Sequence, residues 1–223
     1  MNVRLLEHTH LSSAVIAART CWNSFHKGGL YDSPTNEITE EDKTLLSRLL
    51  FKNKHESIFE HIVYVFNILG IPRLCLQELA RHRIASYSVK STRYTLKELK
   101  YEKSFIFYSL DKYEYSYDID RAKQFIEINS NVNTNFQCQQ LEFLREVLLD
   151  GVSLDDAKYL LPESYLTDLV MTINVRSLRN FLQLRLSKSA HKSIRALANE
   201  MLTSLPVEHL FLYKDLLEEN KND

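Results

Sequence analysis

The nine-residue run HIVYVFNIL, at positions 61–69, is the feature that most limits the folds open to this chain. Its β-branched and aromatic residues favour a strand, and it is much too short to span a membrane. Residues 3–6, 104–109 and 167–175 have the same strand character. Because helical patterns separate these strands, we expect one α/β (mixed α+β) domain over residues 1–223, with a central, mostly antiparallel sheet flanked by helices.

The segments between these strands carry helix signals. Thr39 is a predicted N-cap, because acidic residues follow it at once and a leucine-rich periodic segment comes next. Pro72 opens a helix that we expect to end near 81–83. Recurring apolar residues predict one long amphipathic helix over most of 118–149. Shorter helices are expected at 12–21, 153–162, 176–186, 189–204 and 206–219, with a glycine-containing loop at 26–37.

Composition excludes several classes of protein. A chain of 223 residues that is 44% hydrophobic can bury a substantial core without disulfides. Its net charge of −1 argues against a general nucleic-acid coat or a basic membrane anchor. The first residues lack the apolar segment of a signal peptide, so we expect a reduced, cytoplasmic protein. Cys21, Cys75 and Cys138 form no CxxC pair, so we expect neither a disulfide scaffold nor a metal site.

The segment RHRIASYSVKSTRYT, residues 81–95, concentrates positive charge in an almost neutral chain. It contains three arginines, one lysine and one histidine, and no acidic residue occurs between positions 79 and 97. Since it follows a predicted helix, we expect a loop or irregular segment here. Arginine forks and serine hydroxyls suit phosphate oxygens. The four glycines of the chain form neither GxGxxG nor GxxxxGK, so a nucleotide would have to be held by side chains.

A second polar set lies in TINVRSLRNFLQLRL, residues 172–186. If this segment is helical, Arg176 and Asn180 lie four residues apart on one face. Arg185 lies nine residues beyond Arg176, half a turn away, and is expected to serve a different contact.

Other interpretations of these patterns remain open. Clustered arginine and lysine are typical of a solvated surface, and the interleaved Tyr87 and Tyr94 would also suit single-stranded nucleic acid. His55 and His61 would lie on opposite faces of a helix, which favours core or surface roles over a metal site. A nucleotide-binding or RNA-binding module without catalysis is therefore the alternative of a different class.

Arg81, His82 and Arg83, followed after seven residues by Ser91 and then by Arg93, resemble the signature of the flavin-dependent thymidylate synthases (ThyX family). AARTCW, HESIFEHIVY and TINVRSLRNFLQLR resemble further family segments in the same order, so the resemblance covers about residues 17–195. It implies an α/β homotetramer with bound FAD and active sites built from several subunits. The implied reaction makes dTMP from dUMP, with 5,10-methylenetetrahydrofolate giving the carbon and NADPH giving reducing equivalents through the flavin.

The resemblance also assigns contacts position by position. It implies that FAD is contacted by Ser57, Arg81, His82, Arg83, Asn174, Arg176 and Asn180. It implies that dUMP is contacted by Glu78, Arg81, Lys90, Ser91, Thr92, Arg93, Lys158 and Arg185. We expect the cationic segment and the NVRSLRN segment to reach one flavin from different subunits.

Arg185 and Ser91 are the candidate catalytic residues. The resemblance implies that Arg185 lies beside the uracil ring, where a fixed cation stabilises developing negative charge. No Ser/His/Asp arrangement is legible around Ser91, so we expect this serine to position the substrate while reduced flavin delivers hydride directly. None of the three cysteines follows a proline, unlike the cysteine nucleophile of thymidylate synthases that lack flavin.

Some positions depart from the commoner family pattern. Ser88 and Val89 stand where members often carry Asn and Glu, Lys158 where an arginine is frequent, and Ser189 where some members have a histidine. A lysine gives a point charge instead of a planar fork, so we expect altered affinity for the ligands and the same reaction.

Overall fold

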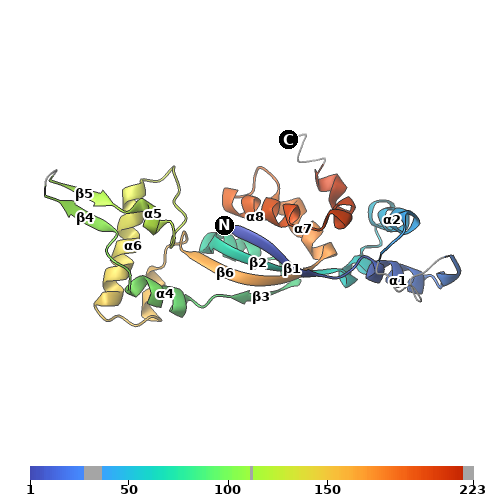
Figure 1. The fold of residues 1–223 in the computed structure, drawn as a ribbon, viewed down its shortest axis with the longest axis horizontal. Coiled ribbons are helices and arrows are strands. Elements are labelled where there is room, and N and C mark those ends of the chain that lie inside the picture. Colours follow the sequence, from blue (N-terminus) through green and yellow to red (C-terminus); the bar gives the residue numbers. More distant parts are fainter. Residues whose placement is uncertain (28–36, 111–112, 218–223) are drawn as a thin grey trace. The chain divides into compact units, whose positions relative to one another are not determined.

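The computed structural model describes residues 1–27, 37–110 and 113–217, and Figure 1 shows helices and strands alternating along them in a mixed α+β fold. One sheet has the strand order β1-β2-β6-β3, and β4 pairs with β5 in an antiparallel hairpin. The strands are β1 (Asn2–His8), β2 (Val63–Pro72), β3 (Ala85–Val89), β4 (Ile106–Ser109), β5 (Glu114–Tyr117) and β6 (Leu166–Asn174).

The helices follow the strands in most of the places that the sequence predicts. The α-helices are α1 (Ser12–Cys21), α2 (Glu40–Ser47), α3 (Arg73–Leu79), α4 (Thr92–Lys100), α5 (Ile119–Ala122), α6 (Thr134–Leu149), α7 (Val175–Arg185) and α8 (Lys192–Thr203). A π-helical turn, η2 (Arg48–Lys52), continues α2. The 3₁₀ helices are η1 (Phe25–Lys27), η3 (Glu56–His61), η4 (Asp156–Leu160) and η5 (Val207–Tyr213).

The chain divides into two compact units. The first unit contains Met1, Leu69–Ala80 and Ser88–Leu169. The second unit contains Asn2–Ile68, Arg81–Tyr87 and Val170–Asp223. Strands β2, β3 and β6 each contribute residues to both units.

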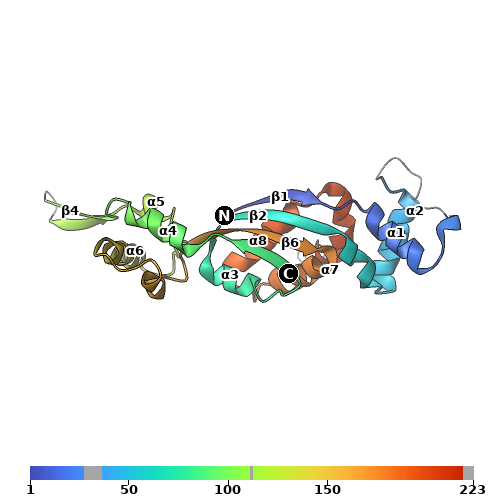
Figure 2. The same cartoon turned by 90° about the horizontal axis from the view of Figure 1, so that it is seen from below.

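In the second unit, helices α7 and α8 lie along one face of β1 and β2 (Figures 1 and 2). Every second residue from Tyr64 to Ile68 in β2 is fully buried, which is the alternation that burial of one sheet face requires. Leu178 and Phe181 bury the apolar face of α7 at helical spacing. Because α1 and α7 both pack on η3, the polar face of α7 is held beside the residues of η3.

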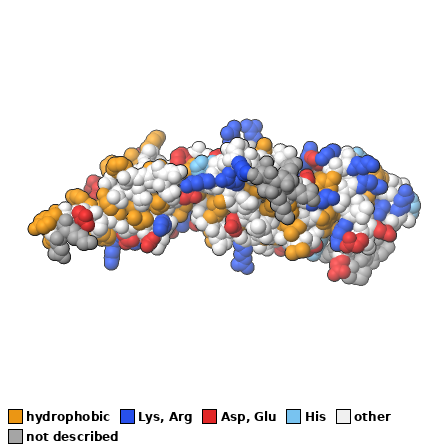
Figure 3. Space-filling view, turned by 90° about the horizontal axis from the view of Figure 1, so that it is seen from above, with side chains coloured by type: hydrophobic (Ala, Val, Ile, Leu, Met, Phe, Trp, Pro, Cys, Tyr) orange, Lys and Arg blue, Asp and Glu red, His pale blue; other side chains and the backbone are white. Residues whose placement is uncertain are grey.

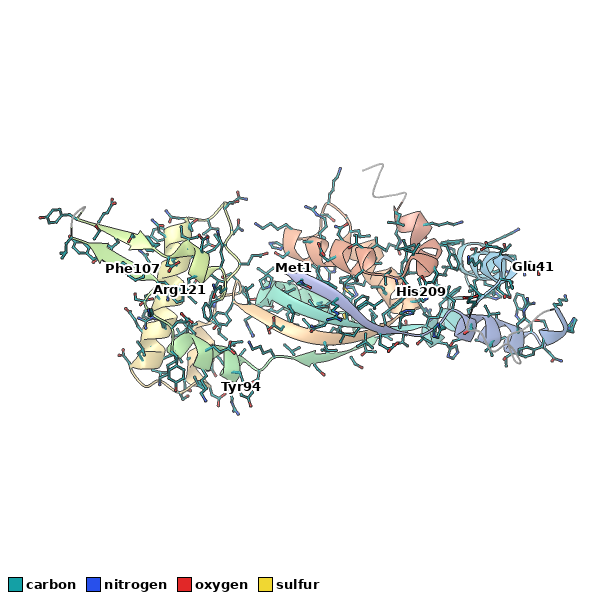
Figure 4. The ribbon with its side chains drawn as sticks, in the orientation of Figure 1. Met1, Glu41, Tyr94, Phe107, Arg121 and His209 are labelled. Atoms are coloured by element: carbon teal, nitrogen blue, oxygen red, sulfur yellow. The ribbon has the colours of Figure 1, made fainter. Side chains whose placement is uncertain are left out.

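In the first unit, α4, α5 and α6 surround a separate apolar core. Its buried members are Leu96, Leu99, Phe105, Ala122, Ile126, Cys138, Leu141, Leu144, Leu148, Ala157 and Tyr165. Arg121, labelled in Figure 4, donates to the carbonyl oxygens of Lys103 and Ser104 and lies 4.6 Å from the centroid of the Phe105 ring. These contacts tie α5 to the chain that enters β4.

The cationic segment is more regular than its sequence predicts, so the expectation of a loop is wrong for most of it. Ala85–Val89 forms β3, at one end of the strand order, and Thr92–Lys100 forms α4. The hydroxyl of Ser91 caps α4 by accepting the backbone N–H of Arg93 at 3.3 Å. An edge strand is paired on one side only, so it needs few apolar residues. The polar sequence ASYSV therefore gave no strand signal.

The prediction of one long helix over 118–149 is also wrong. Helix α5 ends at Ala122, and α6 begins only at Thr134. Between them, Ile126 pairs with Tyr165, and the side chain of Gln137 bonds backbone groups of Asn129. Asn133 caps α6 by accepting two backbone N–H groups. Side chains that bond nearby backbone compete with helical hydrogen bonds, which is why the asparagine-rich middle is not helical.

Other local predictions are confirmed. Thr39 and Asp42 form the capping box of α2, and Pro72 precedes the first residue of α3. The predicted strands at 3–6, 61–69, 104–109 and 167–175 all correspond to observed strands. Most of the predicted loop at 26–37, and the last residues of the helix expected at 206–219, lie outside the described residues.

The β4–β5 hairpin exposes aromatic side chains. Tyr108, Tyr113 and Tyr115 are exposed by 50%, 81% and 63%, and hydrophobic side chains gather at the hairpin end in Figure 3. The sequence analysis did not predict β5.

Among the described residues, no helix is long and apolar enough to cross a membrane.

Candidate active site

The second unit contains a pocket of about 920 Å³. Its walls come from η3, the segment 81–84, α7 and residues 215–216. The lining residues are Leu50, Lys54, Glu56, Phe59, Glu60, Arg81, His82, Arg83, Ile84, Arg176, Ser177, Arg179, Asn180, Gln183, Leu184, Arg185, Asp215 and Leu216. Residues separated by more than a hundred positions in sequence therefore share one cavity.

Five arginines line this pocket: Arg81, Arg83, Arg176, Arg179 and Arg185. Arginine donates in a planar fork that matches phosphate oxygens, and several of them around one cavity favour an anion of high charge. Volume and donors together fit a ligand that carries a pyrophosphate, as FAD does.

Carboxylates hold Arg176 at the pocket wall. Its Nη1 lies 2.6 Å from Oε1 of Glu60, and its Nε lies 3.3 Å from Oε2 of Glu56. Both partners come from η3, and Arg176 is the second residue of α7. Asn174 caps α7 by accepting the N–H of Ser177 at 2.9 Å, and the two ion pairs of Arg176 tie the start of this helix to η3.

His82 and Arg185 contact each other inside the pocket. The Nε atom of Arg185 lies 3.2 Å from Nε2 of His82 and donates to it. The His82 ring also packs edge-on against Phe181, with ring centroids 4.9 Å apart. Burial, and then the positive charges of Arg185 and Arg81, lower the pKa of His82 below its ordinary value. A neutral His82 keeps an acceptor for Arg185.

Arg179 closes the pocket on the side of the C-terminal segment. Its guanidinium donates to both carboxylate oxygens of Asp215, at 2.9 and 2.5 Å, and to the carbonyl oxygen of Leu212. This bidentate pair fixes Asp215 and Leu216 as part of the wall.

A smaller pocket of about 320 Å³ adjoins the first and shares Lys54, Glu56 and Arg176 with it. Trp22 and His55 line it, with ring centroids 5.7 Å apart and planes nearly perpendicular. Ser57 also lines this pocket. An aromatic wall beside a cation suits a flat, charged ligand.

The remaining predicted substrate residues lie in the first unit. Lys90, Ser91, Thr92 and Arg93 run from the end of β3 into α4. Lys90 lies 3.1 Å from a carboxylate oxygen of Glu98 and 3.8 Å from one of Asp168. Arg93 and Lys158 both pair with Asp155. Glu78 lies on α3 and is half-buried.

The structure brings together most of the residues predicted to contact FAD. Arg81, His82, Arg83, Arg176 and Asn180 all line the large pocket, Ser57 lines the adjoining one, and Asn174 caps α7. Arg185 lines the same pocket as Arg176 but makes a different contact there, with His82 instead of Glu56 and Glu60, as the spacing on the helix predicted. One chain also places the cationic segment and the NVRSLRN segment on a single pocket, whereas the sequence interpretation assigned them to different subunits.

Sequence reasoning missed several residues of both pockets. Glu56, Glu60 and Arg179 carry charge into the large pocket, and Trp22 and His55 form the aromatic wall of the small one. The segments AARTCW and HESIFEHIVY contain four of these five residues, so the resemblance marked the segments without marking the side chains. Arg179 lies between Arg176 and Asn180, where the helical spacing alone gave it no role.

Comparisons of the sequence with known proteins find relatives along nearly the whole chain. The Thy1 family, described as thymidylate synthase complementing protein, matches residues 4–207. The flavin-dependent thymidylate synthase of Wolinella succinogenes is 50% identical over 217 residues, covering 96% of this chain and 97% of that protein. The protein of the same name from Campylobacter jejuni is 47% identical over 221 residues, covering 99% of both chains.

A solved structure has a similar fold. The flavin-dependent thymidylate synthase ThyX from Helicobacter pylori, complexed with FAD and dUMP, superposes with a TM-score of 0.83 at 41% sequence identity. The match covers 97% of this chain and 99% of that one. A second structure of the Helicobacter pylori enzyme with FAD and dUMP gives a TM-score of 0.85, covering 98% and 100% of the two chains.

Proposed function

The chain belongs to the thymidylate synthase complementing protein family, and from that premise we propose that it is a flavin-dependent thymidylate synthase. It is an enzyme of dTMP biosynthesis that methylates dUMP reductively. The observation that carries the proposal is the 920 Å³ pocket, in which the signature residues Arg81, His82 and Arg83 meet Arg176, Asn180 and Arg185.

FAD is held in the large pocket by side chains. Arg81, Arg83 and Arg176 donate charge-assisted hydrogen bonds to its pyrophosphate, and Asn180 presents an amide beside them. Ser57 extends the site into the adjoining pocket, and Asn174 holds α7 in place. When bound and reduced, FAD supplies a hydride to the pyrimidine.

dUMP is held by its phosphate and by its ring. Lys90, Arg93 and Lys158 are the phosphate cations, and Thr92 adds a hydroxyl at the start of α4. Glu78 and Arg81 complete the contacts to dUMP. In the structure each of the three phosphate cations is paired with a carboxylate, so phosphate binding exchanges one anion for another.

Arg185 stabilises negative charge as the uracil ring is activated. A fixed cation aimed at developing charge acts in the transition state and needs no reorganisation at that moment. His82 positions this cation through its hydrogen bond to Nε. Ser91 positions the substrate. Its hydroxyl accepts the backbone N–H of Arg93, and among the described residues no histidine or carboxylate forms a hydrogen bond with it that could activate it as a nucleophile.

The co-substrates and the domain organisation complete the proposal. 5,10-Methylenetetrahydrofolate supplies the carbon, and NADPH supplies the reducing equivalents. Residues 1–223 act as one flavin-dependent thymidylate synthase domain, a view supported by a family match that runs from residue 4 to residue 207 through both compact units. The cytoplasmic location expected from the sequence stays a prediction.

The enzyme is a homotetramer whose subunits share active sites. Exposed aromatic side chains on the β4–β5 hairpin, such as Tyr113 and Tyr115, support assembly, because contiguous apolar surface is rare on monomers. Light scattering of the purified protein should give four times the chain mass. Mixing an Arg81→Ala chain with an Arg176→Ala chain tests whether the two residues reach one flavin from the same chain. Because both residues line the large pocket of one chain, verified subunit exchange should restore no activity. Restored activity would instead assign Arg81 and Arg176 of one flavin site to different subunits.

An anaerobic single-turnover experiment tests the reaction. Purified protein should be yellow, or become so with added FAD, and should bleach on reduction with NADPH. Addition of dUMP and methylenetetrahydrofolate should then yield dTMP and restore the oxidised flavin spectrum. A colourless protein that gains no flavin absorbance with FAD, and forms no dTMP, would favour a binding module without catalysis.

A further inference from the structure

Two cations of the first unit share one carboxylate. Arg93 donates through Nε to Oδ1 of Asp155 at 3.1 Å and through Nη2 to Oδ2 at 2.7 Å. Lys158 donates through Nζ to Oδ1 at 2.6 Å. Arg93 is near the start of α4, Asp155 directly precedes η4, and Lys158 belongs to η4. The carboxylate therefore joins cations that lie 65 positions apart in the sequence.

Asp155 is charged throughout the physiological range. Hydrogen bonds from Arg93 first, and from Lys158 second, lower the pKa of its carboxyl to about 2. Three donor hydrogens point at its two oxygens, so this carboxylate satisfies the same donor edge of Arg93 that a phosphate would take.

We propose that Asp155 is a positioning residue of the phosphate site: it gathers Arg93 and Lys158 when the site is empty, and competes with the phosphate of the substrate for both. This inference rests on the proposed function, because that function assigns Arg93 and Lys158 to dUMP. As the phosphate arrives, the carboxylate gives up the two cations. As the product leaves, it takes them back, which weakens retention of a nucleoside monophosphate and favours its release.

The competition of Asp155 with phosphate outweighs its effect in holding Arg93 and Lys158 together, because all three side chains are substantially exposed. Arg93 is 63% exposed, Asp155 54% and Lys158 35%. Exposed ion pairs restrain their partners weakly, so removing the carboxylate should change the conformational freedom of the Arg93 and Lys158 side chains only slightly. A fixed negative charge beside a phosphate dianion, in contrast, repels it in every bound state. Removing that charge should therefore tighten phosphate binding by about twofold to fivefold, the range expected for exposed charge pairs.

The neighbouring residue provides a matched control. Asp156 accepts from the hydroxyl of Ser153 at 2.6 Å and contacts neither cation. Asp155→Asn and Asp156→Asn change the net charge equally, so only a specific effect distinguishes them. Asp155→Ser, which removes the amide as well, serves as a second test variant if Asp155→Asn lowers the melting temperature.

Equilibrium binding to the full-length, FAD-loaded protein tests the proposal. dUMP, deoxyuridine and inorganic phosphate are titrated calorimetrically at one fixed salt concentration. Asp155→Asn should bind dUMP and inorganic phosphate about twofold to fivefold more tightly than the unchanged protein, with deoxyuridine affinity unaltered. Asp156→Asn should match the unchanged protein.

If both Asp155 variants bind dUMP only as tightly as the unchanged protein, or more weakly, the proposed competition between Asp155 and the phosphate is wrong. An equal gain in Asp156→Asn would also overturn it, because the effect would then be one of net charge. The proposed function fails in a different way: the unchanged protein would neither bind dUMP nor form dTMP, whatever the Asp155 variants do with inorganic phosphate.

Discussion

The Nε atom of Arg185 donates a hydrogen bond to Nε2 of His82 at 3.2 Å, across 103 positions of sequence. A histidine that accepts at Nε2 is neutral and carries its proton on Nδ1. The signature histidine therefore orients the arginine that we assign to the uracil ring. The ring of Phe181 packs nearly perpendicular to the imidazole, so the acceptor that orients Arg185 is itself restrained.

Replacing Arg185 by Ala should lower the rate at saturating dUMP by roughly a hundredfold or more, the usual cost of removing one stabiliser of developing charge. Arg93→Ala should instead weaken dUMP binding by roughly tenfold, the loss of one charge-assisted hydrogen bond at an exposed position, and leave flavin occupancy unchanged. Steady-state kinetics with flavin absorbance checks both variants. If Arg185→Ala raises only the Michaelis constant for dUMP, Arg185 is a binding cation and not a catalytic one.

Protonation of His82 should disconnect it from Arg185. Since burial and two arginines lower the pKa of His82, the neutral form persists below the ordinary histidine value of about 6.5. The decrease in kcat on the acid side of its pH profile should therefore occur at a pH below that ordinary value. His82→Gln offers an amide oxygen as acceptor and has no proton to gain, so its profile should lack this decrease. An unchanged decrease in His82→Gln would show that another group controls it.

Removing the Ser91 hydroxyl should cost stability more than chemistry. The hydroxyl caps α4, and losing such a cap costs about 1 kcal/mol of unfolding free energy. Ser91→Ala should therefore melt at a lower temperature and retain measurable dTMP formation, and Ser91→Cys should also retain activity. Denaturant unfolding and turnover assays separate the two effects. Normal dUMP binding by Ser91→Ala with no detectable dTMP would restore the nucleophile interpretation.

A buried histidine should make stability depend on pH. His209, labelled in Figure 4, is 1% exposed. Its Nδ1 lies 2.8 Å from the hydroxyl oxygen of Tyr64 in β2. The ring centroid of His8 lies 4.9 Å away, and His10, Glu208 and Tyr213 are the other titratable groups around this site. Burial, and then the charge of His8, lower the pKa of His209 to about 4.

Between pH 6.5 and 4 the unfolded chain binds a proton at position 209 that the folded chain rejects. Unfolding free energy should therefore fall as the pH is lowered through this window, by about 3 kcal/mol in total from His209. His209→Asn should flatten this dependence, and the exposed His26→Asn should leave it unchanged. Urea unfolding at a series of pH values measures the slope, and equal slopes in all three proteins would exclude His209 as its source.

The sequence by itself determined the features that depend on neighbouring residues. The strand HIVYVFNIL, the cap at Thr39 and the shared face of Arg176 and Asn180 follow from residue type and from helical or strand period, which act over a few positions. The signature spacing also marked residues that meet in one pocket. Where side chains compete for nearby backbone, as around Asn129 and Asn133, periodicity alone predicted a helix that does not form.

Only the tertiary structure decided which charges meet. Asp155 contacts Arg93 across 62 positions, Glu60 contacts Arg176 across 116, and Arg185 contacts His82 across 103. No local pattern encodes such pairs, because the energy of an ion pair depends on distance and burial, and both are set when distant segments pack together. The physical reason is general: backbone preferences act locally, whereas packing brings remote side chains within hydrogen-bonding distance.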